Sequence, residues 1–429
     1  MLRELGKGFK NKPSVLTRDR TASSCQTGSM SARSSRSSTI DGTRSTRRQV
    51  LLVIESSRES GRQFIAGVSD YAQHFGPWRF HWQPQGLNGL ARPLGKLWCD
   101  GVILRDVADL AAVRAAGVPA IVLGHAKRRV KGAVFVGVDD EAVSQVVTSH
   151  LRQRGFRNFA FCGYRGVPWS ESREESYSRV LRQEGFRVAC LRVPLEAEHG
   201  LGTAGAREQL KDWFQKLPRP VGLMAANDDL GEQVIELCKE AGIRVPDDCA
   251  VVGVDNDPVV CGLSDPPLSS VNIHFRQAGY RAAATLDRLM HGIPPPDWSI
   301  HAEAGDLVER QSSNRIAVED PAVARALRFI HNQGRGPVSV AEIARESGVS
   351  RRILEQRFRQ ELSQSVLQVH RAVRAAHIAR LLTETDLSLA EVAEQCAFTQ
   401  FSHLTRFFRA MRGETPSAFR KRLAGVRMS

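Results

Sequence analysis

The last hundred or so residues of this chain carry one helical pattern twice. One copy runs from Val340 to Phe358 and the other from Leu389 to Phe408. In each copy a short amphipathic helix is followed by a tight break and then by a second helix that begins near a polar residue. A helix-turn-helix of this kind lays its first helix across a DNA backbone and its second in the major groove. The sequence therefore predicts two DNA-reading units on one chain.

The two copies divide their residues between a core and an outer face. Apolar positions recur at helical spacing in the first copy, which predicts a core of Ile343, Ala344, Val349, Leu354 and Phe358, and Leu404 and Phe408 take this role in the second. The candidates for DNA contact are Ser350, Arg351, Arg352, Glu355, Gln356, Ser402, His403 and Arg406. Arg pairs with guanine, Gln suits adenine and Glu accepts from cytosine. The alternative is that these residues form the solvated face of an ordinary helical bundle. The repetition of the pattern makes this alternative weaker.

Charge is distributed unevenly along the 429 residues. Residues 321–429 hold eighteen Lys and Arg against nine Asp and Glu, and residues 1–48 hold eleven against three. The centre is slightly acidic, which suggests a sensor joined to a domain that binds a polyanion. Because residues 1–48 are rich in Ser and Arg and poor in apolar side chains, we expect them to be disordered. A transit peptide, or a translation start at Met30, are alternatives for this segment.

Residues 49–310 alternate short apolar runs with helical patterns. Strands are predicted at 50–54, 101–104, 120–123, 159–161, 221–226 and 250–254. Helices are predicted at 62–75, 109–116, 141–154, 173–184, 203–217, 230–241 and 277–291. The strands are continuous Val, Ile and Leu runs, as a parallel sheet covered on both faces requires. We therefore expect an α/β, two-lobed, doubly wound sensor whose ligand binds at the carboxyl ends of the strands.

A polar link is predicted at 311–320, followed by an all-α domain at 321–429 that begins at the capping pair Asp320-Pro321. Its two motifs fall at about 340–361 and 389–411. A helix at 366–383, about 27 Å long at 1.5 Å per residue, would separate them by nearly one turn of duplex DNA.

Other function classes find little support in the sequence. The eight cysteines form no C-x-x-C pair and no zinc-like cluster with histidine. We find no phosphate-binding glycine loop and no set of nucleophile and base, so we expect neither catalytic residues, nor a metal, nor another cofactor. No run of 18 apolar residues predicts a membrane span, and we expect a cytoplasmic protein.

The C-terminal residues resemble the AraC-type family of transcription regulators. The matching positions are Gly348-Val-Ser350 with Leu354 and Phe358, then 389–408, then Thr415-Pro-Ser-Ala-Phe-Arg420. The resemblance covers about 100 residues. It departs at the second turn, where that family has Gly and this chain has Ala397. If φ is positive there, Ala costs roughly 1 kcal/mol relative to Gly.

The central residues resemble LacI-type regulators and periplasmic sugar-binding proteins. The resemblance rests on 116–123, on Ala226-Asn-Asp-Asp229 and on 241–256. It implies a small sugar as effector, with a xylose-like pentose as the leading candidate. The residues expected to bind it come from both lobes and are Arg62, Trp169, Arg173, Asp228 and Asn256. Carboxylates, amides and an Arg fork are what sugar hydroxyls need.

Local alternatives stay open for some of these residues. Asp228 could cap the next helix, Arg173 could pair with Glu174 at the surface, and Trp169 could fill core. The two resemblances together imply a ligand-controlled regulator that activates genes of sugar catabolism. It is expected to bind operator DNA as a homodimer and to contact RNA polymerase at the nucleoid. A regulator of a non-sugar ligand, or a sugar-binding protein with no DNA role, are the alternatives.

Overall fold

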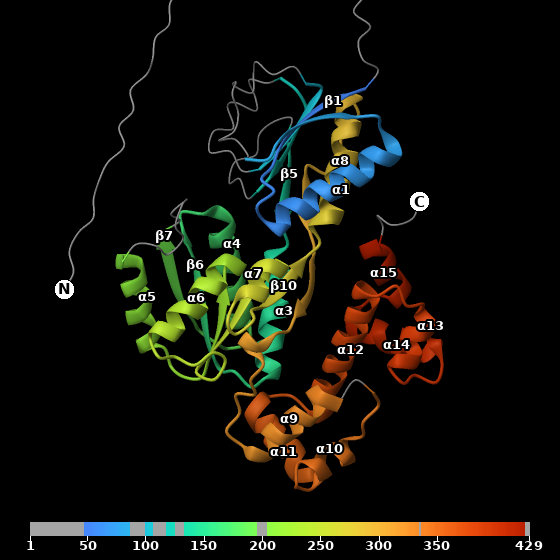
Figure 1. The fold of residues 1–429 in the computed structure, drawn as a ribbon. Coiled ribbons are helices and arrows are strands. Elements are labelled where there is room, and N and C mark those ends of the chain that lie inside the picture. The colour runs from blue at the N-terminus through green and yellow to red at the C-terminus, as the bar shows by residue number, and fades with distance from the viewer. Residues whose placement is uncertain are drawn as a thin grey trace, which may run out of the picture. The chain divides into compact units, whose positions relative to one another are not determined.

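The computed structural model of the protein describes residues 47–85, 99–105, 117–124, 133–194, 204–333 and 336–424. Two six-stranded sheets form the two lobes of the sensor, and seven helices form the C-terminal domain (Figure 1). The expected α/β sensor followed by an all-α domain is confirmed. The helix predicted at 109–116 and most of the segment 1–48 lie outside the described residues.

The first sheet has the strand order β11-β5-β4-β3-β1-β2, and all of its neighbours are parallel. Its strands are β1 Gln49–Val53, β2 Arg79–Gln83, β3 Gly101–Arg105, β4 Ala120–Leu123, β5 Ala133–Val138 and β11 Ser299–Ala302. The predicted runs at β1, β3 and β4 are buried along nearly their whole length. Strands β2, β5 and β11 were not predicted.

The second sheet has the order β12-β10-β9-β8-β6-β7, in which β12 alone is antiparallel to its neighbour. Its strands are β6 Asn158–Arg165, β7 Val188–Pro194, β8 Val221–Ala225, β9 Cys249–Asp255, β10 Ser269–Ile273 and β12 Ala304–Val308. The chain passes between the lobes after β5, after β10 and after β11. Each lobe is therefore built from separate stretches of sequence.

The sensor helices follow the predicted periodicity. They are α1 Glu59–Phe75, α3 Asp140–Gln153, α4 Pro168–Gln183, α5 Ala204–Lys216, α6 Asp228–Glu240, α7 Pro258–Leu263 and α8 Phe275–Met290. Helices α1 and α8 touch backbone to backbone. A Cβ at Gly279 would lie 2.1 Å from the carbonyl oxygen of Phe64, and one at Gly67 would lie 1.8 Å from that of Arg276. Only glycine allows the two helices to approach this closely.

The segment 311–320, predicted as a link, begins as part of the second lobe. A 3-10 turn spans Gln311–Ser313, and Ser312 is buried. Its hydroxyl donates to the carbonyl of Val251 at 2.7 Å and accepts from the amide of Ser269 at 2.8 Å. The Ser312 side chain therefore bonds backbone groups of the interior strands β9 and β10, which the composition of this segment alone does not reveal.

The C-terminal domain consists of α9 Pro321–Gln333, α10 Val340–Glu346, α11 Arg351–Leu362, α12 Val366–Glu384, α13 Leu389–Gln395, α14 Phe401–Arg412 and α15 Pro416–Ala424. Asp320 caps α9, as predicted, by accepting from the amides of Ala322 and Val323. Two separate apolar cores lie in this domain. One contains Leu354 and Phe358, and the other contains Leu404 and Phe408. Helix α12 contributes to both, which makes it the connection between the two motifs.

Candidate functional sites: an interlobe cleft and two recognition helices

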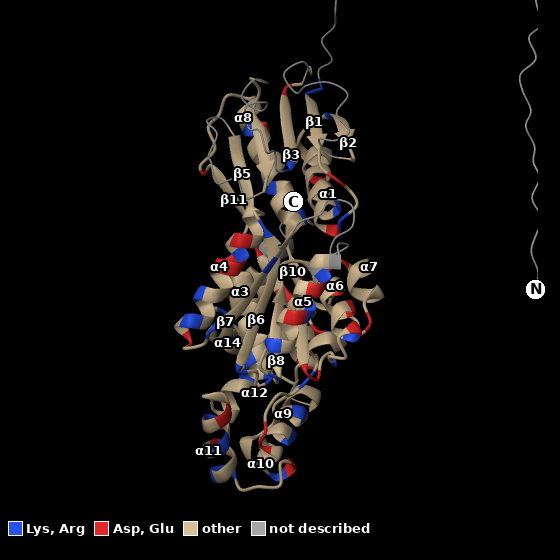
Figure 2. Ribbon diagram, turned by 90° about the vertical axis from the view of Figure 1, so that its left-hand side faces the viewer, with Lys and Arg blue, Asp and Glu red and all other residues tan. Residues whose placement is uncertain are grey.

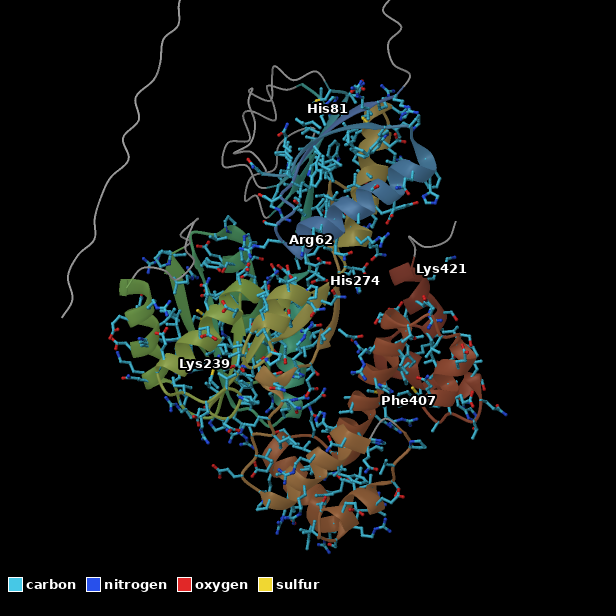
Figure 3. All side chains as sticks on the ribbon, viewed as in Figure 1. Arg62, His81, Lys239, His274, Phe407 and Lys421 are labelled. Carbon is cyan, nitrogen blue, oxygen red and sulfur yellow. The ribbon has the colours of Figure 1, made fainter. Side chains whose placement is uncertain are left out.

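The two sensor lobes meet where α1 of the first lobe faces loops of the second (Figure 3). Nη2 of Arg62 lies 3.3 Å from Oδ2 of Asp257, and the amide of Glu59 donates to the same oxygen at 3.0 Å. Arg58 forms a second ion pair across the lobes, with Asp229. Asp229 and Asp257 both follow strands of a parallel sheet, so the contacts lie at the edge where such folds bind ligands.

Asp228 is buried at the first turn of α6, with 3% of its surface exposed. Oδ1 accepts from the hydroxyl of Ser270 at 2.5 Å, and Oδ2 accepts from the amide of Asp257 at 2.7 Å. Burial raises the pKa of Asp228 well above its ordinary value. The helix cap is Asn227, whose side chain accepts from the amide of Leu230. Asp228 therefore braces the loop after β9 and does not cap α6.

Arg173 is buried in the second lobe rather than paired with Glu174 at the surface. Its Nε lies 3.0 Å from Oδ1 of Asp140, and its guanidinium also donates to the carbonyl of Ala226. The guanidinium carbon lies 5.6 Å from the ring centre of Trp169, which packs edge-on against Tyr164. The structure thus brings Arg173 and Trp169 together beside the end of β8.

Asn256 occupies the left-handed region at φ 52°, which Asn tolerates better than most residues. Its Oδ1 accepts from Nη2 of Arg310 at 2.9 Å, and its amide donates to the hydroxyl of Ser270 at 3.0 Å. Ser270 therefore links Asn256 to Asp228. Hydrogen bonds to Ser270, Asp228 and Arg310 thus hold the loop after β9 and restrict its freedom to rearrange.

Asp255 is a second carboxylate of this site whose pKa is raised. Burial raises its pKa to about 6, although Arg173 and Arg105 oppose the shift. Arg105 ends β3 in the first lobe and forms an ion pair with Glu55 at 3.0 Å. Neither Asp255 nor Arg105 is among the residues that the sequence predicted to bind the ligand. Their shared position at the ends of strands β9 and β3 is the signal that could have found both.

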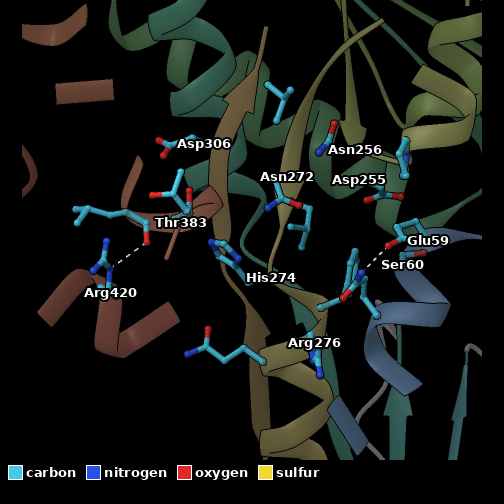
Figure 4. A pocket seen from close by; sticks show the side chains of 18 of the residues that line it. Glu59, Ser60, Asp255, Asn256, Asn272, His274, Arg276, Asp306, Thr383 and Arg420 are labelled. Carbon is cyan, nitrogen blue, oxygen red and sulfur yellow. Dashed lines mark hydrogen bonds between the residues drawn. The ribbon is translucent and has the colours of Figure 1, made fainter. Parts of the chain in front are cut away.

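A cavity of about 560 Å³ opens beside this loop, between the sensor and the last helices of the chain (Figure 4). Glu59, Asp255 and Asn256 line it from the sensor, and Thr383 and Arg420 line it from the C-terminal domain. Of the five residues predicted to bind ligand, Asn256 alone is in the lining. Arg62 reaches the cross-lobe ion pairs instead, and the other three lie deeper at the strand ends.

The two helix-turn-helix units repeat each other closely. Both first helices begin with a capping box, formed by Ser339 with Glu342 and by Ser388 with Glu391. In both, an arginine of the preceding helix donates to the carbonyl of the residue that follows the first helix. Arg325 donates to Ser347 at 2.7 Å, and Arg374 donates to Cys396 at 2.9 Å. These arginines satisfy carbonyls that a helix end leaves without a partner.

The second helices, α11 and α14, expose corresponding faces. Arg351, Arg352 and Gln356 are exposed on α11, and Ser402, His403 and Arg406 are exposed on α14. Ser350 caps α11 by accepting from the amide of Ile353 at 3.4 Å. Lys and Arg residues mark α9 and α11 in Figure 2. A basic, regularly spaced face of this kind matches a DNA-reading surface.

Two features of these faces differ from the sequence prediction. Glu355 is partly buried, and its Oε2 is inaccessible to solvent, because its position borders the core residue Leu354. Ile353 and Phe401, which were not singled out, are each 41% exposed. Apolar side chains on a recognition helix can contact the methyl group of thymine. Ala397 at the second turn has φ 53°, which is the left-handed conformation. This is the position where the AraC-type family has Gly.

Comparisons with known proteins agree with both halves of the chain. A periplasmic binding protein-like domain matches residues 148–313, and a helix-turn-helix domain matches 343–422. These matches and the fold define the class: the chain is a transcription regulator that joins a periplasmic-binding-protein-like sensor domain to a helix-turn-helix domain. Its full-length relatives include the xylose operon regulatory protein of Escherichia coli K12, 26% identical over 390 residues, which span 87% of this chain and 97% of that protein.

Two further relatives support this placement. The xylose operon regulatory protein of Haemophilus influenzae is 24% identical over 388 residues, which cover 87% of this chain and 98% of that protein. A solved structure of a xylose-binding transcription activator matches with a TM-score of 0.55 and 26% identity, covering 88% of this chain and 98% of that one.

Within the described residues, no helix has the length and apolar character needed to cross a bilayer.

Proposed function

We propose that this regulator senses a small sugar between its two lobes, and that a xylose-like pentose is the first candidate. The relatives named for xylose support this choice. The observation that carries the proposal is the meeting of donors and acceptors from both lobes at the ends of strands, with Arg62 beside Asp257 and Asn256 next to it. Sugar hydroxyls both donate and accept, so they need such a mixed set.

The proposed contacts are divided by chemistry. Arg62 and Asn256 would donate to or accept from ring hydroxyls, and Trp169 would cover an apolar face of the sugar. Arg173 would offer a guanidinium that Asp140 already orients at 3.0 Å. Asp228 was proposed as a direct acceptor. Both of its oxygens accept buried hydrogen bonds within the protein. Asp228 would therefore act on the ligand indirectly, by holding the loop after β9 in position.

The proposed output is control of transcription from operator DNA. The exposed residues of α11 and α14 would contact bases, and Ser350 would contact a phosphate. Ligand binding would close the two lobes of the sensor and alter the contact between the subunits of a homodimer. This would change how the DNA-binding domains are placed on the operator and next to RNA polymerase. A ligand shifts such an equilibrium only by its differential affinity for the two states. Activation rather than repression, and a site of action at the cytoplasmic nucleoid, belong to this proposal.

Thermal unfolding of the full chain across a panel of pentoses and hexoses tests the effector. A sugar at a hundred times its dissociation constant should stabilise the protein by about 2.7 kcal/mol. Arg62→Ala should weaken that response, whereas Arg79→Ala, which removes an exposed arginine from β2 of the same lobe, should not. If no sugar shifts the transition, the sugar assignment fails, and a non-sugar ligand becomes the better hypothesis.

A further inference from the structure

The two recognition helices end in different ways. Helix α14 is followed by Gly413 at φ 80°, a conformation that glycine adopts without penalty. Helix α11 is followed by Ser363 at φ 57°, in the same left-handed region. Serine carries a Cβ that disfavours this region. The end of α11 is thus intrinsically the weaker of the two and needs support from elsewhere.

That support comes from the second lobe of the sensor. Nη2 of Arg157 donates to the carbonyl of Gln360 at 2.7 Å, and its Nε donates to the carbonyl of Glu361 at 3.2 Å. Nη2 of Arg152 donates to the carbonyl of Leu362 at 3.3 Å. Three successive carbonyls at the end of α11 therefore accept from sensor arginines. These are carbonyls that have no partner within a helix, and they lie at the negative end of its dipole.

Contacts within the sensor fix the side chain of Arg152. It is 8% exposed, its Nε lies 3.2 Å from Oε2 of Glu184, and its guanidinium carbon lies 4.4 Å from the ring centre of Phe186. Arg157, by contrast, is exposed and lies just before β6. The contact therefore combines a rigid buried donor with a surface donor that can be removed without opening the core.

We infer that Arg152 and Arg157 are positioning residues, which fix the first recognition helix to the second sensor lobe so that a movement of that lobe is passed to the first motif. The second motif lacks the equivalent connection among the described contacts. Helix α14 meets the sensor through an ion pair between Arg412 and Asp306 at 2.8 Å, which holds a side chain and not the carbonyls of the helix end. The two motifs are therefore coupled to the sensor unequally.

Hydrogen exchange of the full chain tests this inference, with Arg157→Ala compared with wild type and with Arg187→Ala. Arg187 is an exposed arginine of the same lobe that donates none of these bonds. Arg157→Ala should raise exchange in residues 359–365 by roughly fivefold to tenfold, since local opening depends on such bonds. Exchange in 401–413 should stay unchanged, as should both segments in Arg187→Ala. Unchanged exchange in 359–365, or an equal rise in both helices, would overturn the inference.

A second arm adds D-xylose, and it rests on the proposed function. In wild type the sugar should protect residues 226–230 and 255–260 and also change exchange in 359–365. In Arg157→Ala the protection at the cleft should remain while the change in 359–365 is lost. If the sugar protects nothing in wild type, the sugar assignment fails, yet the sugar-free comparison still decides the role of Arg157. If the sugar still changes exchange in residues 359–365 of Arg157→Ala, the coupling through Arg157 is contradicted.

Discussion

The carboxylate of Asp228 accepts a hydrogen bond of 2.5 Å from the hydroxyl of Ser270, and both residues are buried. Ser270 lies on β10 and also accepts from the amide of Asn256. Asp228 in turn accepts from the amide of Asp257. The loop that follows β9 is thus shaped by two side chains beneath it. The cleft residues depend on this buried network for their positions.

Asp228→Ala should lower the free energy of unfolding by about 1–3 kcal/mol, because it leaves a buried hydroxyl and a buried amide without their acceptor. Asp229→Ala is the control, since it removes a neighbouring carboxylate whose ion pair involves the exposed Arg58 and should cost at most about 1 kcal/mol. Chemical denaturation measures both. If Asp228→Ala keeps full stability and loses only the sugar response, its carboxylate contacts the ligand directly.

Asp255 should make stability depend on pH. Its pKa in the folded chain is raised to about 6, so the ionised form is disfavoured by folding. The stability that the neutral carboxyl provides is complete below about pH 4 and is lost as the pH rises through 6. Asp255→Asn removes this loss, and its gain over wild type should therefore grow by about 1–2 kcal/mol between pH 4.5 and pH 7. A gain that is equal at both pH values would show that the group does not titrate there.

Ala397→Gly should stabilise the C-terminal domain by about 0.5–1 kcal/mol, because φ is 53° at this turn and an alanine Cβ is disfavoured there. Ala410→Gly is the matched control. This exposed alanine lies inside α14, where the same substitution should cost about 1 kcal/mol. Thermal unfolding of the full chain compares the two. Destabilisation by both substitutions would mean that the turn does not hold the left-handed conformation in solution.

Arg352→Ala and Arg406→Ala should each weaken binding to an operator by about 1–3 kcal/mol, and each should relax sequence preference at a different place. The reason is that α11 and α14 are joined by α12, whose 19 residues span about 28 Å, close to one turn of duplex DNA. Footprinting on a sequence selected by the wild-type protein measures this. Loss of the same bases in both variants would refute two separate reading sites.

Local patterns in the sequence were enough to predict the fold class, the order of the domains and both helix-turn-helix motifs. The predicted strands contain continuous apolar runs, such as β8, where every residue is apolar or glycine. Strands β2 and β7 were missed because they lie at sheet edges, where exposed residues interrupt the partly buried ones. A short run with that pattern resembles a loop. Strand β11 was missed because the polar residues Ser299 and His301 interrupt its apolar residues.

Helix starts, apolar runs and the side chains that follow each strand depend on neighbours along the chain, and these could be predicted from the sequence. The folded chain was needed to show that Asp228 joins a buried network, that Glu355 is partly covered, and that Arg157 reaches the carbonyls of Gln360 and Glu361. Those partners are separated by 29 to 204 residues in sequence. A hydrogen bond depends on distance and direction in space, and no local pattern records which distant atom will complete it.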